Sequence, residues 1–253
     1  MRHASVGWVC GVLLLCGACP GVRATVPVTF DLEVGAVTAG LNDVRIPGDT
    51  GTRFSLVDDL SSDARGFLRL RATYALGPRH RLSALFAPLT LKASGSVDRA
   101  ITFEDVTFAA RMPLAADYTF NSYRLTYART VHQSDRWTVD LGLTAKIRDA
   151  VVEVRSADRT ARKTNVGFVP LIYFGVDWRL GPRVGLSFAG DALAAPQGRA
   201  EDARLAFWYA PRPAVRLSAG YRVLEGGADN DEVYSFALLH YATLGVTVAL
   251  PGR

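Results

Sequence analysis

The stretch from Trp137 to Arg148 alternates apolar and polar residues without interruption. Its odd-numbered residues are apolar and its even-numbered residues are polar or glycine, which is the pattern of an extended strand with one apolar and one polar face. The alternation runs for twelve residues, longer than the usual strand of a globular protein. The polar face carries charges of both signs, and such a strand suits a wall between lipid and a polar interior.

The first 24 residues predict a secretory signal peptide. Arg2 and His3 precede an apolar run from Val6 to Ala18, and Ala24 supplies the small residue of a cleavage site. The run is shorter than the roughly 20 residues that a membrane-spanning helix needs. We therefore expect a signal peptide over 1–24 and a mature barrel over 25–253. The residues up to Cys19 also resemble a lipoprotein signal, so lipidation of Cys19 stays open as an alternative.

Composition excludes several classes of function. All three cysteines lie in the first 19 residues, so the mature chain is expected to have no disulfide, thiol nucleophile or cysteine metal site. The mature chain has 27 basic and 24 acidic residues, a net charge of +3. A nucleic-acid-binding protein carries a clear basic excess, and we expect no such partner here.

The same alternation recurs along the mature chain and predicts an all-β fold. No apolar window long enough for a membrane helix and no convincing helical stripe follows the first segment, so a membrane crossing requires a closed antiparallel β-barrel. We expect about ten strands, with eight or twelve as alternatives. The predicted strands are Val28–Val34, Leu68–Leu76, Arg81–Lys92, Ser122–Ala128, Trp137–Arg148 with a continuation to Arg155, Val166–Arg179, Val184–Asp191, Ala203–Tyr209, Val215–Val223 and Tyr234–Leu250.

The predicted connections alternate between short and long. Short turns fall near Gly77, Ser134, Gly181 and Pro213, whereas the longest loops are Thr38–Asp63 and Ala93–Ala116, the second with a small hairpin over 101–108. Transmembrane barrels have short turns on one side and longer loops on the other. An even strand number returns both chain ends to the side of the short turns.

Aromatic residues are expected to form two rings on the outer wall, as in membrane barrels. The ring near the short turns would contain Tyr74, Tyr127, Trp137, Trp178 and Tyr209, and the ring near the long loops Phe67, Tyr118, Phe120, Tyr234 and Phe236. A soluble barrel or sandwich is the alternative, because alternation alone does not say which face meets water.

Three features together resemble the small outer-membrane β-barrel proteins of Gram-negative bacteria: the exported N-terminus, the hairpin phrases Tyr74–Arg79 and Trp178–Arg183, and the last strand ending Gly245–Leu250. The resemblance implies an outer-membrane location, a monomer, and contact with outer-membrane lipid, lipopolysaccharide and the barrel-assembly machinery. Such proteins commonly end on an aromatic residue. This chain instead ends on Leu250-Pro251-Gly252-Arg253.

Charged residues of inward parity are the candidate site. In a barrel of about ten strands the interior is narrow, and opposite charges there pair and fill it. We therefore predict a structural lumen charge network, with an anion-favouring pore as the alternative because arginines are in excess. The network residues are Arg69, Arg71, Arg124, Asp140, Lys146, Arg148, Asp177, Arg179, Arg216 and Arg222; Asp31, Glu33 and Arg204 share their parity.

No catalytic residues are predicted. His240 has lipid-facing parity, so either a bulge turns it inward or it lies near the outer interface, and no serine follows it at the spacing of a lipid A deacylase. Acidic residues collect at the long-loop side as an omptin protease would require, but without a histidine; they are Asp191, Glu201, Asp202, Glu225, Asp229, Asp231 and Glu232. No cofactor fingerprint, phosphate loop or metal-ligand spacing is present. The expected role is structural or in surface interaction, with a membrane-embedded hydrolase as a second alternative after the pore.

Overall fold

The computed structural model describes residues 28–196 and 198–250, and the predicted signal peptide and its cleavage site lie outside them. The described residues contain no helix of the length and apolarity that crossing a membrane would need. Ten long strands form the wall, with β5 continued by β6 after an interruption at Pro88 and Leu89. They are β1 (Val28–Arg45), β4 (Arg65–Ala75), β5 (His80–Ala87) with β6 (Thr90–Gly95), β9 (Leu114–Gln133), β10 (Trp137–Arg155), β11 (Thr160–Arg179), β12 (Val184–Ala195), β13 (Gly198–Arg212), β14 (Val215–Asp229) and β15 (Tyr234–Leu250). Four short strands lie between them: β2 (Phe54–Ser55), β3 (Ser61–Ser62), β7 (Ile101–Phe103) and β8 (Val106–Phe108).

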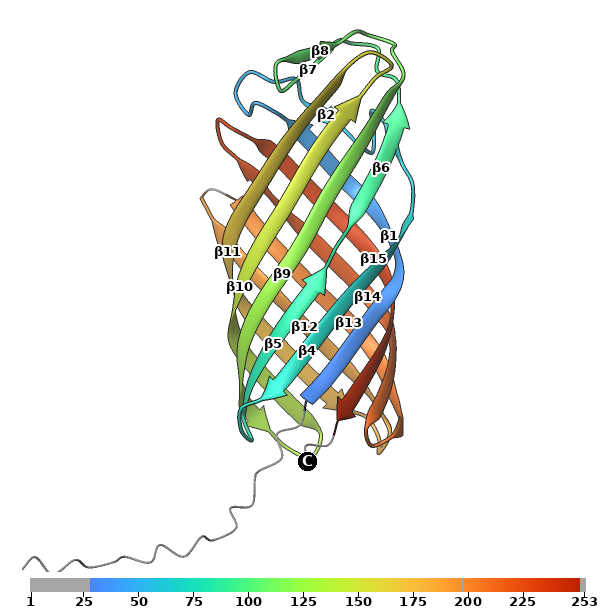
Figure 1. The fold of residues 1–253 in the computed structure, drawn as a ribbon. Helices are drawn as coiled ribbons and strands as arrows, with labels where there is room; N and C mark the ends of the chain where they lie inside the picture. Colours follow the sequence, from blue (N-terminus) through green and yellow to red (C-terminus); the bar gives the residue numbers. More distant parts are fainter. Residues whose placement is uncertain (1–27, 197, 251–253) are drawn as a thin grey trace, which may run out of the picture.

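The strands close into a barrel, which confirms the predicted fold class (Figure 1). Every pairing is antiparallel, and sequence neighbours pair around the wall. β15 returns to β1 with a register that runs from Val28 opposite Leu250 to Arg45 opposite Tyr234. Closure leaves the wall without a free first or last strand, which a bilayer requires because unpaired backbone groups cannot be hydrated there.

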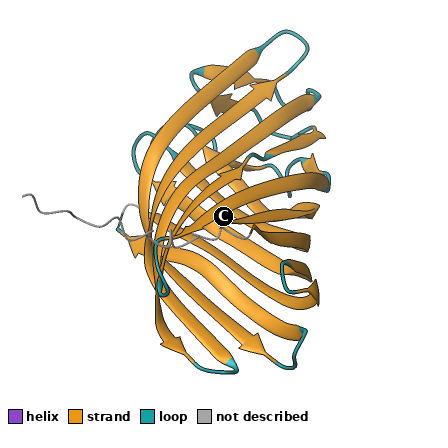
Figure 2. Ribbon diagram, turned by 60° about the horizontal axis from the view of Figure 1, so that its bottom comes forward, coloured by secondary structure: helices purple, strands orange, loops and turns teal. Residues whose placement is uncertain are grey.

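The two ends of the barrel differ. The "turn end" carries the four short turns, and the "loop end" carries β2, β3, β7 and β8 (Figures 1 and 2). The predicted hairpin over 101–108 forms as β7 and β8. The long loops are shorter than predicted, because β1 continues to Arg45 and β9 begins at Leu114. The predicted strands Val184–Asp191 and Ala203–Tyr209 leave residues 192–202 as a loop. This is wrong, because nearly all of this sequence is strand, in β12 and β13.

The outer wall is apolar along its length. In β10, Leu141 and Leu143 are exposed whereas Asp140, Thr144 and Lys146 are buried, as the alternation of the opening stretch predicts. The ring predicted near the turn end is confirmed: its five aromatic residues are 36–44% exposed, and the Trp137 and Trp178 rings stack with centroids 4.9 Å apart. Amphipathic rings at this level are typical of a membrane interface.

The ring predicted near the loop end is wrong for three of its residues. Phe67 and Tyr118 are buried, and both have the inward parity of their strands; Phe120 shares the parity of Tyr118. The cause is an apolar interior at this end, where both long loops fold into the barrel mouth and pack against the inner wall. Phe54, Leu56, Ile101, Phe103 and Phe108 from the loops lie in one buried cluster with Val152, Val154 and Leu239 from the wall.

Candidate functional site

A buried carboxylate, Asp202 of β13, is the centre of the charge network inside the barrel. It accepts hydrogen bonds from Arg69 at 2.9 Å and Arg124 at 2.7 Å, and a further bond from Arg222. These four residues are 3–8% exposed. Their strands, β13, β4, β9 and β14, reach the lumen from different parts of the wall, so the ion pairs span it.

Two further carboxylates complete this network. Glu33 of β1 accepts both donors of the Arg222 fork at 2.8 Å, a bidentate geometry that fixes the guanidinium plane. Arg204 approaches Glu33 at 3.2 Å. Asp191 of β12 accepts from Arg124 at 2.6 Å and also from the Thr144 hydroxyl. Buried charges require such pairing because an isolated charge in a low-dielectric interior is costly.

Three of the predicted residues, Asp140, Asp177 and Arg216, form smaller pairs nearer the turn end. Asp140 accepts from Thr130 at 2.7 Å and pairs with Arg81 of β5. Asp177 accepts from Arg216 at 2.6 Å. Arg71 lines the cavity beside these pairs, whereas Arg179 is exposed at the end of β11 and forms no side-chain ion pair within the described residues.

The structure corrects the placement of two acidic residues. Asp191 and Asp202, predicted on the acidic rim of the long loops, both lie inside the barrel. The error follows from ending β12 and starting β13 at the wrong residues. Asp202 has the same parity as Arg204, so extending the predicted strand by one residue would have placed it in the lumen.

The network separates two cavities that share no lining residue. The "turn-end cavity", of about 240 Å³, is lined by polar side chains such as Arg71, Thr73 and Ser218. The "loop-end cavity", of about 370 Å³, is lined mainly by apolar side chains. Arg69, Arg124 and Asp202 line neither of the two cavities, whereas their partners Asp191 and Arg222 line the turn-end cavity.

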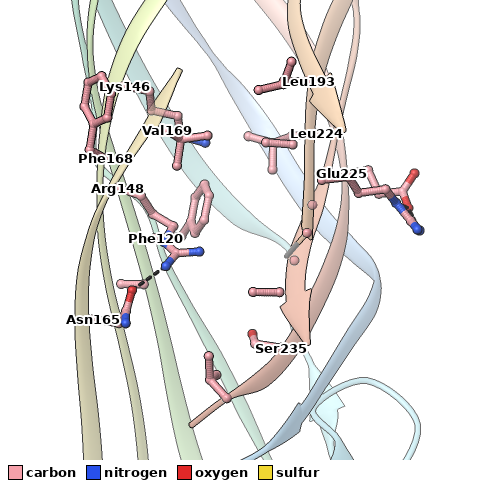
Figure 3. A pocket seen from close by; sticks show the side chains of 18 of the residues that line it. Phe120, Lys146, Arg148, Asn165, Phe168, Val169, Leu193, Leu224, Glu225 and Ser235 are labelled. Atoms are coloured by element: carbon pink, nitrogen blue, oxygen red, sulfur yellow. Dashed lines mark hydrogen bonds and ion pairs between the residues drawn. The ribbon is translucent and has the colours of Figure 1, made fainter. Parts of the chain in front are cut away.

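Two predicted network residues, Lys146 and Arg148, line the loop-end cavity instead of joining the ion pairs (Figure 3). Lys146 is 3% exposed, and its ammonium lies 4.8 Å from the centre of the Phe120 ring. Among the described residues it has neither a hydrogen bond nor an ion pair. Arg148 donates one bond to Asn165, and its buried Nε has no partner there. Leu193, Leu224 and Glu225 lie on the opposite side of this cavity (Figure 3).

His240 does not form part of a catalytic arrangement. Its ring faces outward, and its Nδ1 shares a hydrogen bond of 2.5 Å with the Tyr221 hydroxyl. The bulge expected near it lies in the neighbouring strand β1, at Gly40, where a side chain would collide with the imidazole. Within the described residues no histidine pairs with a carboxylate and no group of three metal-ligating side chains occurs.

Comparison with solved structures supports the fold class. The outer membrane protease OmpT from Escherichia coli superimposes with a TM-score of 0.54 at 9% identity, over 88% of this chain and 97% of that one. Two further matches are weaker: Ail from Yersinia pestis, crystallised with sucrose octasulfate (TM-score 0.40, 10% identity, 88% and 99% covered), and an outer membrane channel from Pseudomonas putida (0.42, 13%, 92% and 99%). No protein-family model and no curated protein sequence matches the chain. The chain therefore has the fold of Gram-negative outer-membrane β-barrels, and these neighbours differ among themselves in role.

Proposed function

We propose that the protein is an outer-membrane barrel sealed against free diffusion, with a structural or surface-interaction role. The observation that carries this proposal is the ion-pair network around Asp202. Its side chains come from β1, β4, β9, β12, β13 and β14. Glu33, Asp191 and Arg222 line the turn-end cavity, and Arg69, Arg124 and Asp202 line neither of the two cavities. An open pore needs a hydrated path, and a buried network of direct ion pairs leaves no such path at this level.

The loop end supplies a second obstruction and the proposed contact surface. Residues 46–64 and 96–113 bury their apolar side chains in the barrel mouth and turn their polar side chains outward. Arg99 ties the two segments together through two bonds to Asp59, of 2.8 and 3.0 Å. A surface ordered in this way is suited to contact with a partner or with lipopolysaccharide outside the cell.

Planar-bilayer recording tests the seal. We expect the refolded protein to insert without ion-conducting steps under conditions in which a general porin conducts. Steady anion-selective conductance would instead establish the alternative of a narrow pore.

Orientation needs a separate measurement. A short epitope inserted between Ala109 and Met112 should be accessible to antibody on intact cells, and one inserted at Gly181 only after the outer membrane is permeabilised. The reverse pattern would contradict the proposed surface role.

A further inference from the structure

The barrel wall is incomplete at one seam. β10 and β11 pair from Trp137–Trp178 to Arg155–Thr160. On its other edge β11 pairs with β12 only from Arg179 to Ile172. β12 turns into β13 soon afterwards, at Ala195 and Gly198. Within the described residues, the stretch of β11 from Thr160 to Leu171 therefore pairs with β10 on one edge and with no strand on the other.

Pro170 explains where this ladder ends. The Arg179 N–H bonds to Arg136 on the β10 side, and backbone donors alternate along a strand. The even-numbered residues of β11 therefore direct their backbone groups toward β12. From Ile172 toward the loop end, Pro170 is the next residue whose backbone groups face β12. Proline has no N–H to donate. The gap is thus encoded in the sequence.

The gap opens into the loop-end cavity. Phe168 and Pro170 have outward parity, yet both line this cavity together with the inward-facing Val169 and Leu193. Val166 and Phe168 on the outer face are 70% and 65% exposed, so the opening is flanked by apolar side chains that suit lipid. A seam at β4 and β5 is also short, but there β3 pairs with β6 and the loops fill the mouth.

The charge of the cavity is the second observation. Two of its four basic residues are neutralised, Lys163 by Glu104 at 2.8 Å and Arg199 by Glu225. Lys146 and Arg148 have no such carboxylate partner among the described residues, although Lys146 is almost fully buried. A buried ammonium without an anion is costly, so the site favours an anionic ligand.

From these features we propose that the loop-end cavity binds a single-chain carboxylate amphiphile, a long-chain fatty acid, that enters sideways from the outer leaflet between β11 and β12. The carboxylate pairs with Lys146 and Arg148. The hydrocarbon chain lies against Val169 and Leu193 and leaves through the gap beside Phe168. A cavity of about 370 Å³ is near the small end of ligand sites, which span roughly 300–1,000 Å³, and this favours one chain over several.

The binding site can be tested in detergent with cis-parinaric acid, a fluorescent fatty acid. We expect saturable binding to the wild type and a loss of affinity of at least tenfold in Lys146→Met and in the Lys146→Met, Arg148→Met double variant. Lys92→Met on the exposed face of β6 is the matched control and should bind as the wild type does. In gel electrophoresis, slower migration of the boiled sample than of the unboiled one shows that each variant is folded. Equal affinity in all four proteins would overturn the proposal, and so would equally tight binding of hexadecyltrimethylammonium.

The lateral route needs its own test and rests on the outer-membrane location proposed above. Pro170→Cys with Ala194→Cys places a cysteine pair where the β11–β12 register would continue, and Ala194→Trp fills the same gap without a cross-link. In liposomes we expect the oxidised cysteine pair, and equally the tryptophan, to block entry of the fatty acid from the bilayer into the loop-end cavity. Reduction of the cysteine pair should restore entry. Unchanged uptake in both closed forms would overturn lateral entry. A barrel that conducts ions and still binds the fatty acid would contradict the proposed seal and leave the proposed binding site standing.

Discussion

Arg124 and Asp202 meet inside the barrel at 2.7 Å, although 78 residues separate them in the chain. Their contact crosses the lumen and so depends on the whole wall being closed. It also links the ion pairs of β12 and β13 to those of β4 and β14, because both residues have several partners.

Removing this central carboxylate should destabilise the barrel strongly. Asp202→Ala leaves three buried guanidinium groups without their shared partner, and breaking a buried ion pair in this way costs about 3–5 kcal/mol. Urea unfolding in lipid vesicles measures the change. Asp177→Ala is the matched control, because its pair with Arg216 is 30–39% exposed and exposed pairs contribute up to about 1 kcal/mol. Equal losses in the two variants would contradict the central role of Asp202.

The apolar core of the loop end should be separable from the wall. Phe103 is fully buried and meets Phe54 edge to face, with ring centroids 6.2 Å apart. Phe103→Ala should cost the loop core about 3–5 kcal/mol and expose Arg99 and Arg111 to trypsin, while migration still changes on boiling because the strand ladders are untouched. Thr107→Ala, on the exposed side of the same hairpin, is the control, and in this variant Arg99 and Arg111 should stay protected from trypsin.

The contact between the two loops should weaken in acid. Hydrogen bonding from Arg99 holds the pKa of Asp59 below its usual range, and the Ser55 N–H also bonds this carboxylate at 2.9 Å. A lowered pKa in the folded state means that the contact stabilises the loops above the ordinary aspartate pKa, about 3.9. That stabilisation is lost as the pH falls through the lower value. Hydrogen exchange over 96–113 at pH 5 and pH 2 should show the loss, and Asp59→Asn should remove most of the difference.

His240→Ala should leave the lipid A composition of the host membrane unchanged. The imidazole bonds only to Tyr221 among the described residues, and this arrangement offers neither a nucleophile nor a carboxylate to orient the ring. Mass spectrometry of lipid A from cells with either form provides the comparison. Loss of a deacylated species in the variant would revive the hydrolase alternative.

Alternation in the sequence is enough to predict the wall. Strand parity follows from a period of two, so the outward Trp137 and Trp178 and the inward Arg69 and Arg124 can be assigned from the order of residues alone. Connection lengths then distinguish the two ends. These are local signals, and each survives an error of a few residues in the strand boundaries.

The interior at the loop end could not be predicted in the same way. The rule that the inward face is polar fails where folded loops cover it, and for this reason the prediction places Tyr118 and Phe120 on the wrong face. Strand ends in alanine- and glycine-rich sequence such as 192–200 carry little alternation. For this reason the inward position of Asp202 could not be predicted. The missing β11–β12 pairing depends on which edge of the strand Pro170 faces, and that is known only once the neighbours are.

Pairing of the first strand with the last also sets an order of assembly. β15 joins β14 on one edge and β1 on the other, so the cylinder cannot close before β15 is in place. A chain cut before Tyr234 would present two unpaired strand edges, on β14 and β1, to the bilayer or to another copy of itself. Closure of the barrel thus requires every strand of the wall, from β1 to β15, and not a subset of them.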